Sequence, residues 1–365
     1  MLPLQEFAEA LAFGEATEFE NLTMVPVMGG TERAEPGYLL LKEAMEAKLA
    51  RVTEVGGGVV PELLFENLAD QPVLTLEGEE LVGAKQNRVV NLTILAAPRS
   101  KIVIPVSCVE AGRWHLVSKE FAPSNQMAFA RVRQVCSRAV TLSMQLQRSR
   151  RSDQIKVWDV IAERSSDLGA SSGTGAMRAI FDQRQTEVEE FVRALPWREG
   201  QAGAAFLIDG MPRGLDVFDH SRTAAKTMAK LVRGYAVDAL AEQRTRMARK
   251  EAGEPERTAG PDGRNPKDKL RDWLAALGQG ETLVAPAVGM GQDVRLANEK
   301  LAVAALWAEE RFVHFCAFST DGTGQRWQRT RPNRRDLQLQ RPLPLPRPRA
   351  SGLRMWIRPD PDEKS

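Results

Sequence analysis

Residues 77–114 hold most of the side chains in this sequence that could perform chemistry, because carboxylates and cations alternate there with short apolar runs. Glu79 and Glu110 are candidates for an acid/base pair, or for the ligands of a divalent metal ion. Arg88 and Arg113 could each bind a phosphate or a carboxylate through two parallel hydrogen bonds. The chemistry predicted for this segment is therefore the binding or processing of a phosphorylated compound.

The same segment holds groups that could recognise the rest of such a ligand. Gln86 and Asn87 offer amide donors and acceptors, and Trp114 offers a face on which a ring can stack. A purely structural interpretation uses the same residues, because a buried arginine–carboxylate pair can satisfy the end of a strand without any catalytic role. The sequence leaves both interpretations open.

Other motifs give weaker signals. The glycine-rich stretch 169–175 precedes a predicted helix and could bind an anion, but it lacks the Lys-Ser/Thr of a P-loop, so a connector is favoured. Cys108 is a candidate nucleophile, although three widely spaced cysteines are typical of buried thiols. Three histidines are too few for a multi-histidine zinc site, and we expect His115 and His314 to be satisfied in or near the core.

Short segments rich in Val, Ile, Leu and Thr predict the strands that position these side chains. In a regular strand Gln86 and Arg88 share a face with Val90. A turn at 97–100 would pair this strand with the next one and bring Glu110 close to Gln86 and Arg88. The spacing favours an antiparallel meander or sandwich. The predicted strands are 59–65, 73–77, 86–95, 101–109 and 114–118.

The period of the apolar residues becomes helical after about residue 124, and it returns to strands near the end of the chain. The fold class predicted is α+β, with an antiparallel sheet or sandwich formed by the N- and C-terminal parts and a helical middle at about 124–280. Helices are expected at 6–13, 39–49, within 155–192, from Ser221 to about 247, and at 267–277. Strands are expected at 22–27, 204–209, 214–218, 283–288, 293–297, 302–308 and 312–318, the last four returning to the first sheet.

Charge divides the chain into an acidic body and a basic tail. The net charge is +2, yet residues 326–349 hold eight arginines against the single acidic residue Asp336. We expect 1–320 to form one domain with an exposed charged linker at 248–266, and 321–365 to be a disordered Pro/Arg-rich tail that could bind nucleic acid. The sequence predicts a cytoplasmic protein without a membrane span or a secretory signal.

Two strings within 66–114, ENLADQPVLTLEGEELVGAKQNR and IPVSCVEAGRW, resemble a prokaryotic domain family associated with ADP-ribosylglycohydrolases and the rhodanese-phosphatase superfamily. QIKVWDVI, GLDVFDHSRTAAKTMAKLVRGYAVDA and EERFVHFCAF look like further parts of it, so the resemblance covers roughly 15–318. The resemblance implies a place in NAD or ADP-ribose metabolism. It supplies no established catalytic residue.

Two functions from different classes follow. In the first, the domain binds or processes a nucleotide related to ADP-ribose, with Glu79 and Glu110 as catalytic carboxylates and the amides, arginines and tryptophan holding the ligand. In the second, it is a non-catalytic scaffold for a partner enzyme, because no recognised nucleophile, metal motif or cofactor fingerprint is present. The sequence does not specify a cofactor, although the carboxylates could hold a divalent metal.

Overall fold

The structure is a computed structural model. The chain divides into two units, Met1–Thr330 and Arg331–Ser365, and all described residues belong to the first. That unit is α+β, as the sequence predicted. The predicted tail at 321–365 and residues 254–262 of the predicted linker lie outside the described residues. The structure describes residues 3–30, 34–147, 149–253 and 263–320.

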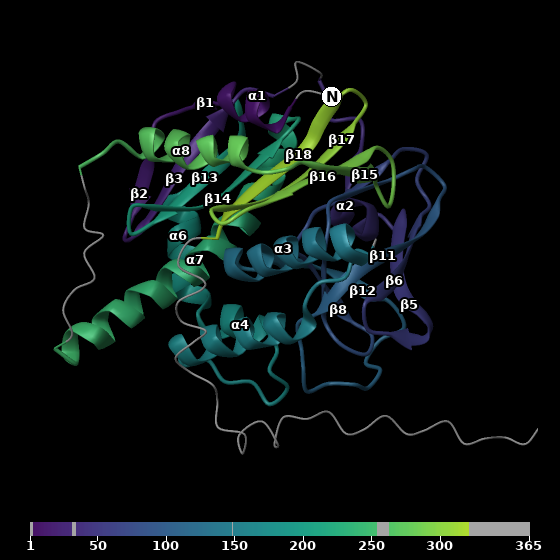
Figure 1. Ribbon diagram of the computed structural model, residues 1–365. Coiled ribbons are helices and arrows are strands. Elements are labelled where there is room, and N and C mark those ends of the chain that lie inside the picture. The colour runs from purple at the N-terminus through teal and green to yellow at the C-terminus, as the bar shows by residue number, and fades with distance from the viewer. Residues whose placement is uncertain (1–2, 31–33, 148, 254–262, 321–365) are drawn as a thin grey trace, which may run out of the picture. The chain divides into compact units, whose positions relative to one another are not determined.

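A nine-stranded antiparallel sheet is the largest element of the unit (Figure 1). Its strand order is β1-β3-β13-β14-β18-β17-β16-β15, and β2 also pairs with β3. The hairpin β13–β14 therefore joins the N-terminal strands to the C-terminal ones. The strands are β1 (Ala12–Phe13), β2 (Thr17–Phe19), β3 (Leu22–Met28), β13 (Gln201–Ile208), β14 (Met211–Phe218), β15 (Leu283–Pro286), β16 (Gln292–Ala297), β17 (Leu301–Ala308) and β18 (Arg311–Ser319).

Helices cover both faces of this sheet, and β13 shows why. All of its residues are buried, and alternate side chains point to opposite faces. Phe206 stacks on Tyr235 of α7 (Ser221–Glu251), with 4.0 Å between the ring centroids. Leu207 packs in a separate core with α1 (Leu4–Glu9) and α8 (Pro266–Leu274) on the other face. A strand buried on both sides reads as a continuous apolar run, which is what residues 202–208 are.

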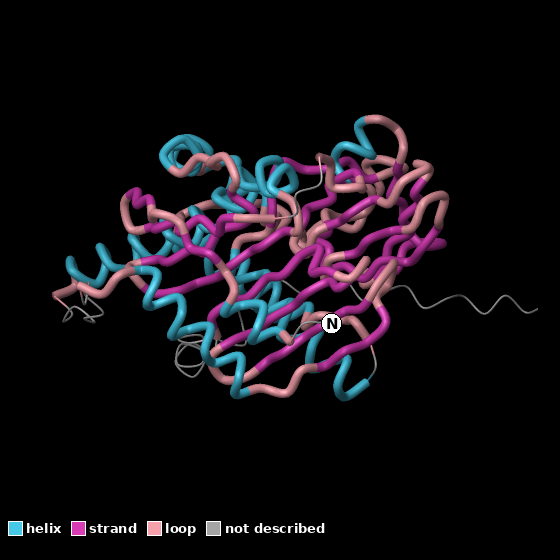
Figure 2. The backbone as a smooth tube through the Cα atoms, turned by 90° about the horizontal axis from the view of Figure 1, so that it is seen from above, coloured by secondary structure: helices cyan, strands magenta, loops and turns pink. Residues whose placement is uncertain are grey.

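Two smaller sheets carry the segment with the candidate site residues. The helices gather mostly beside the nine-stranded sheet, whereas this second region is built mainly of strands and loops (Figure 2). The six-stranded sheet has the order β12-β8-β9-β11-β6-β5, and the three-stranded sheet has the order β10-β7-β4. Their strands are β4 (Leu39–Leu40), β5 (Ala50–Val59), β6 (Glu62–Asn67), β7 (Val73–Thr75), β8 (Glu79–Gly83), β9 (Arg88–Val90), β10 (Ile94–Ala96), β11 (Lys101–Cys108) and β12 (Phe121–Met127).

The remaining helices connect these sheets. The long helix α7 begins after His220, whose Nδ1 accepts a hydrogen bond from the backbone N–H of Arg222 at 3.1 Å, so the cap lies one residue before the predicted Ser221. Within the described ranges, none of the helices is long and apolar enough to cross a bilayer. The other helices are α2 (Leu41–Glu46), α3 (Ala130–Gln147), α4 (Gln154–Asp167), α5 (Arg178–Gln183), α6 (Gln185–Ala194) and a 3-10 turn at Ala275–Gln279.

Several predicted elements were wrong, because tertiary pairing divides stretches that look uniform in sequence. Residues 86–95 form two strands in different sheets, since β9 pairs with β8 and β11 while β10 pairs with β7. Residues 114–118 form no strand, and 39–49 holds a short strand before α2. The strands β15–β18 join β14 and not the sheet at 59–109, because β18 pairs along β14. The middle of the chain therefore supplies the centre of the large sheet.

Substitution of Gly203 on β13 can test how closely β13 and β14 pack. A Cβ at Gly203 would lie 2.2 Å from the carbonyl oxygen of Asp216 and 2.7 Å from the Cα of Val217. Both atoms are backbone, so the strands would have to separate. We expect Gly203→Ala to destabilise the fold by roughly 3 kcal/mol or more, measured by urea unfolding.

The control is Gly57→Ala on β5, where a Cβ meets nothing within 4 Å. Only the conformational preference of the backbone changes there, so its stability should stay within about 1 kcal/mol of the original. Equal losses in both variants would contradict the close approach at Gly203.

Candidate functional site

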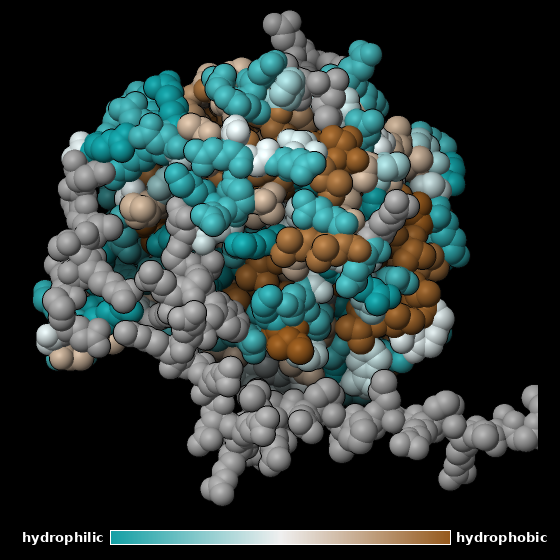
Figure 3. All heavy atoms as spheres, viewed as in Figure 1, coloured by the Kyte–Doolittle hydropathy of each residue, from teal (hydrophilic) through white to brown (hydrophobic). Residues whose placement is uncertain are grey.

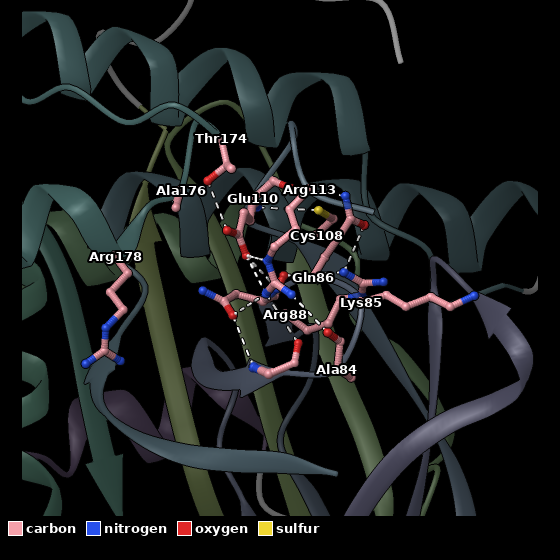
Figure 4. A network of polar contacts seen from close by, with 12 residues as sticks. Ala84, Lys85, Gln86, Arg88, Cys108, Glu110, Arg113, Thr174, Ala176 and Arg178 are labelled. Carbon is pink, nitrogen blue, oxygen red and sulfur yellow. Dashed lines mark hydrogen bonds and ion pairs between the residues drawn. The ribbon is translucent and has the colours of Figure 1, made fainter. Parts of the chain in front are cut away.

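The loop between β8 and β9 and the segment after β11 lie against one another (Figure 4). The strands β9 and β11 pair antiparallel, with Val106 opposite Val90 and Cys108 opposite Arg88. Residues 109–113 therefore continue beside residues 84–87, and the backbone N–H of Val109 donates to the carbonyl of Asn87. The prediction that strand pairing brings Glu110 close to Gln86 and Arg88 is confirmed.

Glu110 is held by three groups from three parts of the chain. Its Oε2 accepts hydrogen bonds from Arg113 Nε at 2.8 Å and from the backbone N–H of Asn87 at 3.2 Å. Its Oε1 accepts from the Thr174 hydroxyl at 2.9 Å. Burial alone would raise the pKa of Glu110, but the hydrogen bonds from Arg113, Asn87 and Thr174 outweigh it and hold the pKa below its usual value. The carboxylate is therefore ionised and largely committed to its protein partners.

Arg113 is committed in the same way. Besides Glu110, its guanidinium donates to the carbonyl of Ala84 at 2.9 Å and to Asn87 Oδ1 at 3.0 Å. The side chain is buried. The pair Glu110–Arg113 therefore closes the loop 84–87 onto the segment 109–113, which is the structural role that the sequence left open.

Arg88 differs from Arg113, because much of its hydrogen-bonding capacity is unused. Its side chain is fully buried, and one terminal nitrogen donates to Gln86 Oε1 at 3.0 Å. Nε and the other terminal nitrogen have no hydrogen-bond partner among the residues that the structure describes. Burial lowers the pKa of this guanidinium, since the charge has lost its water. A buried donor without an acceptor is costly, so the arrangement suits an incoming anion.

Trp114 covers this arginine from the solvent side. The Arg88 guanidinium lies 5.9 Å from the Trp114 ring centroid, and the Lys85 ammonium lies 5.1 Å from it. The ring is 42 % exposed, so it can be reached from solvent. Lys85 also donates to the carbonyl of Gly57. Two cations and one accessible aromatic face thus meet at one point.

Glu79 lies apart from the other six predicted site residues. It stands at the opposite end of β8 from Gly83, about 13 Å away by the rise of a strand. Its carboxylate accepts hydrogen bonds from Lys230 Nζ at 2.8 Å and from the backbone N–H of Leu76 at 3.0 Å. The structure brings together Gln86, Asn87, Arg88, Glu110, Arg113 and Trp114, and it gives Glu79 a different set of partners.

The surroundings of Cys108 decide whether its thiol can act as a nucleophile. Burial raises the pKa of Cys108, against the opposing effect of the nearby Arg88 charge. Gln154 brackets the residue, because its amide bonds both the backbone N–H and the carbonyl of Cys108 at 2.8 Å. A buried neutral thiol is a poor nucleophile, so Cys108 fits the structural interpretation.

Sequence reasoning missed that the glycine-rich connector belongs to this cluster. The carbonyl of Thr174 accepts from the backbone N–H of Gly112 at 2.8 Å, and Ala176 forms an isolated bridge with Glu110. A Cβ at Gly112 would lie 3.0 Å from the Cα of Thr174, so glycine permits the contact. The glycines were visible in the sequence, but their partner segment was not.

A second buried polar cluster was also missed. Arg133 of α3 donates to both oxygens of Asp216 on β14, at 3.0 and 2.5 Å. His314 Nε2 lies 3.2 Å from Asp216, and its Nδ1 lies 2.7 Å from the Thr93 hydroxyl. Burial would raise the pKa of Asp216, but Arg133 and His314 lower it to about 2. The prediction that His314 is a satisfied core histidine is confirmed, whereas the same prediction for His115 was wrong, because that residue is exposed.

Asp216, His314 and Cys316 could in principle hold a metal, since their ligand atoms lie within 4.8 Å of one another. Their chemistry fits poorly, because Arg133 already occupies both Asp216 oxygens. Burial also holds the pKa of the Cys316 thiol well above its usual value, whereas a metal ligand must be a thiolate. We assign this cluster to the core.

Comparison with protein-family models matches residues 10–318 to the ARG and Rhodanese-Phosphatase-superfamily-associated Protein domain. The chain belongs to this family. The match includes the whole polar cluster and the Arg133–Asp216–His314 network, and it ends within β18. Comparisons with curated proteins and with solved structures gave no match.

The Glu110–Arg113 pair gives a test of the structural role within this family domain. Arg113→Ala leaves a buried carboxylate without its cation, so we expect a loss of about 3–5 kcal/mol in the free energy of unfolding. Urea denaturation at neutral pH measures it.

Arg99→Ala is the control, because Arg99 pairs with Asp70 on the surface, where the two side chains are 63 % and 86 % exposed. That pair should contribute at most about 1 kcal/mol. If both substitutions cost the same small amount, Glu110–Arg113 does not hold the loop.

Proposed function

We propose that this domain binds a phosphorylated nucleotide of the ADP-ribose class at Arg88 and Trp114. The observation that carries the proposal is the fully buried Arg88 guanidinium, two of whose nitrogens lack an acceptor within the described part of the chain. A phosphate oxygen would satisfy both nitrogens through charge-assisted hydrogen bonds. Arg113 is a weaker candidate for this role, because its donors already bind Glu110, Ala84 and Asn87.

Trp114 and Lys85 support a nucleotide over a simple anion. The ligand reaches Arg88 when the Trp114 side chain swings aside, and the displaced ring then offers its face to the base or ribose. Lys85 lies on the same ring and adds a second positive charge for a diphosphate. The family name, which links the domain to ARG and the rhodanese-phosphatase superfamily, supports this ligand class.

Arg88 and Trp114 would bind the ligand, and any reaction of the bound ligand would depend on the carboxylates. Glu110 is the predicted carboxylate beside Arg88, and its low pKa makes it an acceptor that stays ionised at neutral pH. An ionised carboxylate could orient a ribose hydroxyl or bind a divalent metal. Glu79, paired with Lys230, is remote from this ligand position.

Calorimetric titration with ADP-ribose, AMP, NAD and inorganic phosphate tests the proposal. Arg88→Met keeps the volume and removes the charge, so we expect ligand affinity to fall by at least roughly tenfold. The melting temperature should stay constant or rise, because the substitution removes an unpaired buried charge.

Arg99→Met is the control, since Arg99 is 63 % exposed and pairs with Asp70 on the surface. It should leave both affinity and melting temperature unchanged. Collapse of the fold in Arg88→Met, or unchanged affinity, would contradict the proposal.

The second candidate function is a scaffold for a partner protein, and one surface favours it. Leu142 and Leu146 lie one turn apart on α3 and are 44 % and 81 % exposed, while Ile155 at the start of α4 is 69 % exposed. Figure 3 shows apolar patches among hydrophilic residues on the face that carries these helices. Exposed apolar surface of this kind is typical of an interaction site. If the domain is a scaffold, nucleotides should not raise its melting temperature, and Leu146→Asp should abolish its association with the partner protein.

A further inference from the structure

A second region with unused polar groups lies on the other side of the connector from Arg88. A cavity of about 340 Å³ opens between β12, α5, α6 and α7. Three of its lining residues are apolar and eight are polar, so a ligand there would be held mainly by polar contacts. The lining residues are Pro123, Ser124, Asn125, Gln126, Arg178, Phe181, Asp182, Gln185, Val188, Glu189 and Arg233.

The two arginines of this cavity differ in what they already bind. Arg233 donates to both oxygens of Glu189, at 2.6 and 3.2 Å. Arg178 lies 3.6 Å from Asp182 and 3.9 Å from Glu80, distances too long for hydrogen bonds. In Figure 4 its guanidinium points away from the Glu110 cluster. Arg178 therefore forms only loose ion pairs with these two carboxylates, and its side chain, which is 41 % exposed, lines the cavity.

The wall also contains acceptors that lack donors. Glu80 is buried, and its Oε2 accepts from the hydroxyl of Ser124 at 2.7 Å. Its Oε1 and the Oε1 of Gln126 have no hydrogen-bond partner in the portion that the structure describes. Ser124 and Gln126 line the cavity, and Glu80, which does not line it, is bound to the Ser124 hydroxyl. Buried acceptors without donors are expected to be satisfied by a ligand or by water.

We propose that this cavity is a second binding site, which takes a small hydroxylated compound carrying one anionic group, of the sugar-monophosphate class. The anionic group binds Arg178, and a hydroxyl group donates to Gln126, whereas Glu80 does not line the cavity and acts on the ligand through its charge. The volume lies at the lower end of the range for small-molecule pockets, so it suits a monosaccharide derivative and not a dinucleotide. The site is independent of the nucleotide site at Arg88, and either can fail without the other.

The charges around Glu80 set how this site responds to pH. Burial raises the pKa of Glu80 to about 7, against the Ser124 hydrogen bond and the Arg178 charge, which lower it. Asp182 of α5 and Glu110 after β11 raise it further. Below this pKa the carboxyl is neutral and can also donate a hydrogen bond. Above it, the carboxylate repels an anionic ligand, so affinity should fall as the pH rises through about 7.

Calorimetric titration of the full chain with ribose 5-phosphate, ribose and inorganic phosphate tests the site. We expect ribose 5-phosphate to bind at least roughly tenfold more tightly than either part alone, because both sets of unpaired groups are then used. Arg178→Gln should remove this preference. Arg193→Gln, on the neighbouring helix but outside the cavity, should not change it, and neither should Arg88→Met.

Glu80→Gln provides the second variant, because it keeps the shape of the side chain and removes its ionisation. The ratio of wild-type to Glu80→Gln affinity should fall several-fold between about pH 6 and pH 8, and the comparison cancels the ionisation of the ligand's own phosphate. Melting temperatures establish that each variant is folded. The proposal would be overturned if phosphate alone bound as tightly as ribose 5-phosphate. It would also be overturned if Arg178→Gln left the affinity for ribose 5-phosphate unchanged, or if Arg88→Met lowered that affinity.

Discussion

Burial of the Asp216 carboxylate in the middle of the large sheet is the constraint on which the rest of the domain depends. A buried charge costs several kcal/mol unless it is neutralised and fully hydrogen-bonded. Arg133 and His314 provide this compensation, and His314 in turn binds Thr93 between β9 and β10. One electrostatic requirement therefore joins α3, the large sheet and the smaller sheets. Because Gly203 has no side chain, the backbone at Asp216 can pack directly against β13.

The polar cluster at residues 84–113 depends on the antiparallel pairing of β9 and β11. The first residue of β9, Arg88, lies opposite the last residue of β11, Cys108, so the loop before β9 and the segment after β11 lie side by side. Glu110 and Arg113 join the two segments by binding each other and the loop 84–87. Arg88 lies inside this closed arrangement with donors that remain unused. A structural ion pair thus creates the environment in which one arginine becomes a candidate for ligand binding.

The buried and partly buried arginines of this domain fall into two groups according to their partners. Arg113, Arg133 and Arg233 have carboxylate partners at hydrogen-bond distance, so their charges are consumed by the fold. Arg88 and Arg178 have none at that distance, and they lie on either side of the connector that joins α4 to α5. Thr174 in this connector binds Glu110, and Arg178 follows four residues later. The connector therefore links the two proposed sites physically while each keeps its own charge.

The sequence by itself determined the α+β class, most strands of the large sheet, and the meeting of Gln86 and Arg88 with Glu110, because these depend on local periodicity and on one hairpin-like pairing. It did not determine that 86–95 divides between two sheets, or that Glu79 binds Lys230, because both depend on contacts between residues far apart in the chain. The same holds for Thr174, Arg178 and the Arg133–Asp216 pair. Which charges are neutralised and which stay free is decided by tertiary structure, since the cost of a charge depends on its burial and its partners.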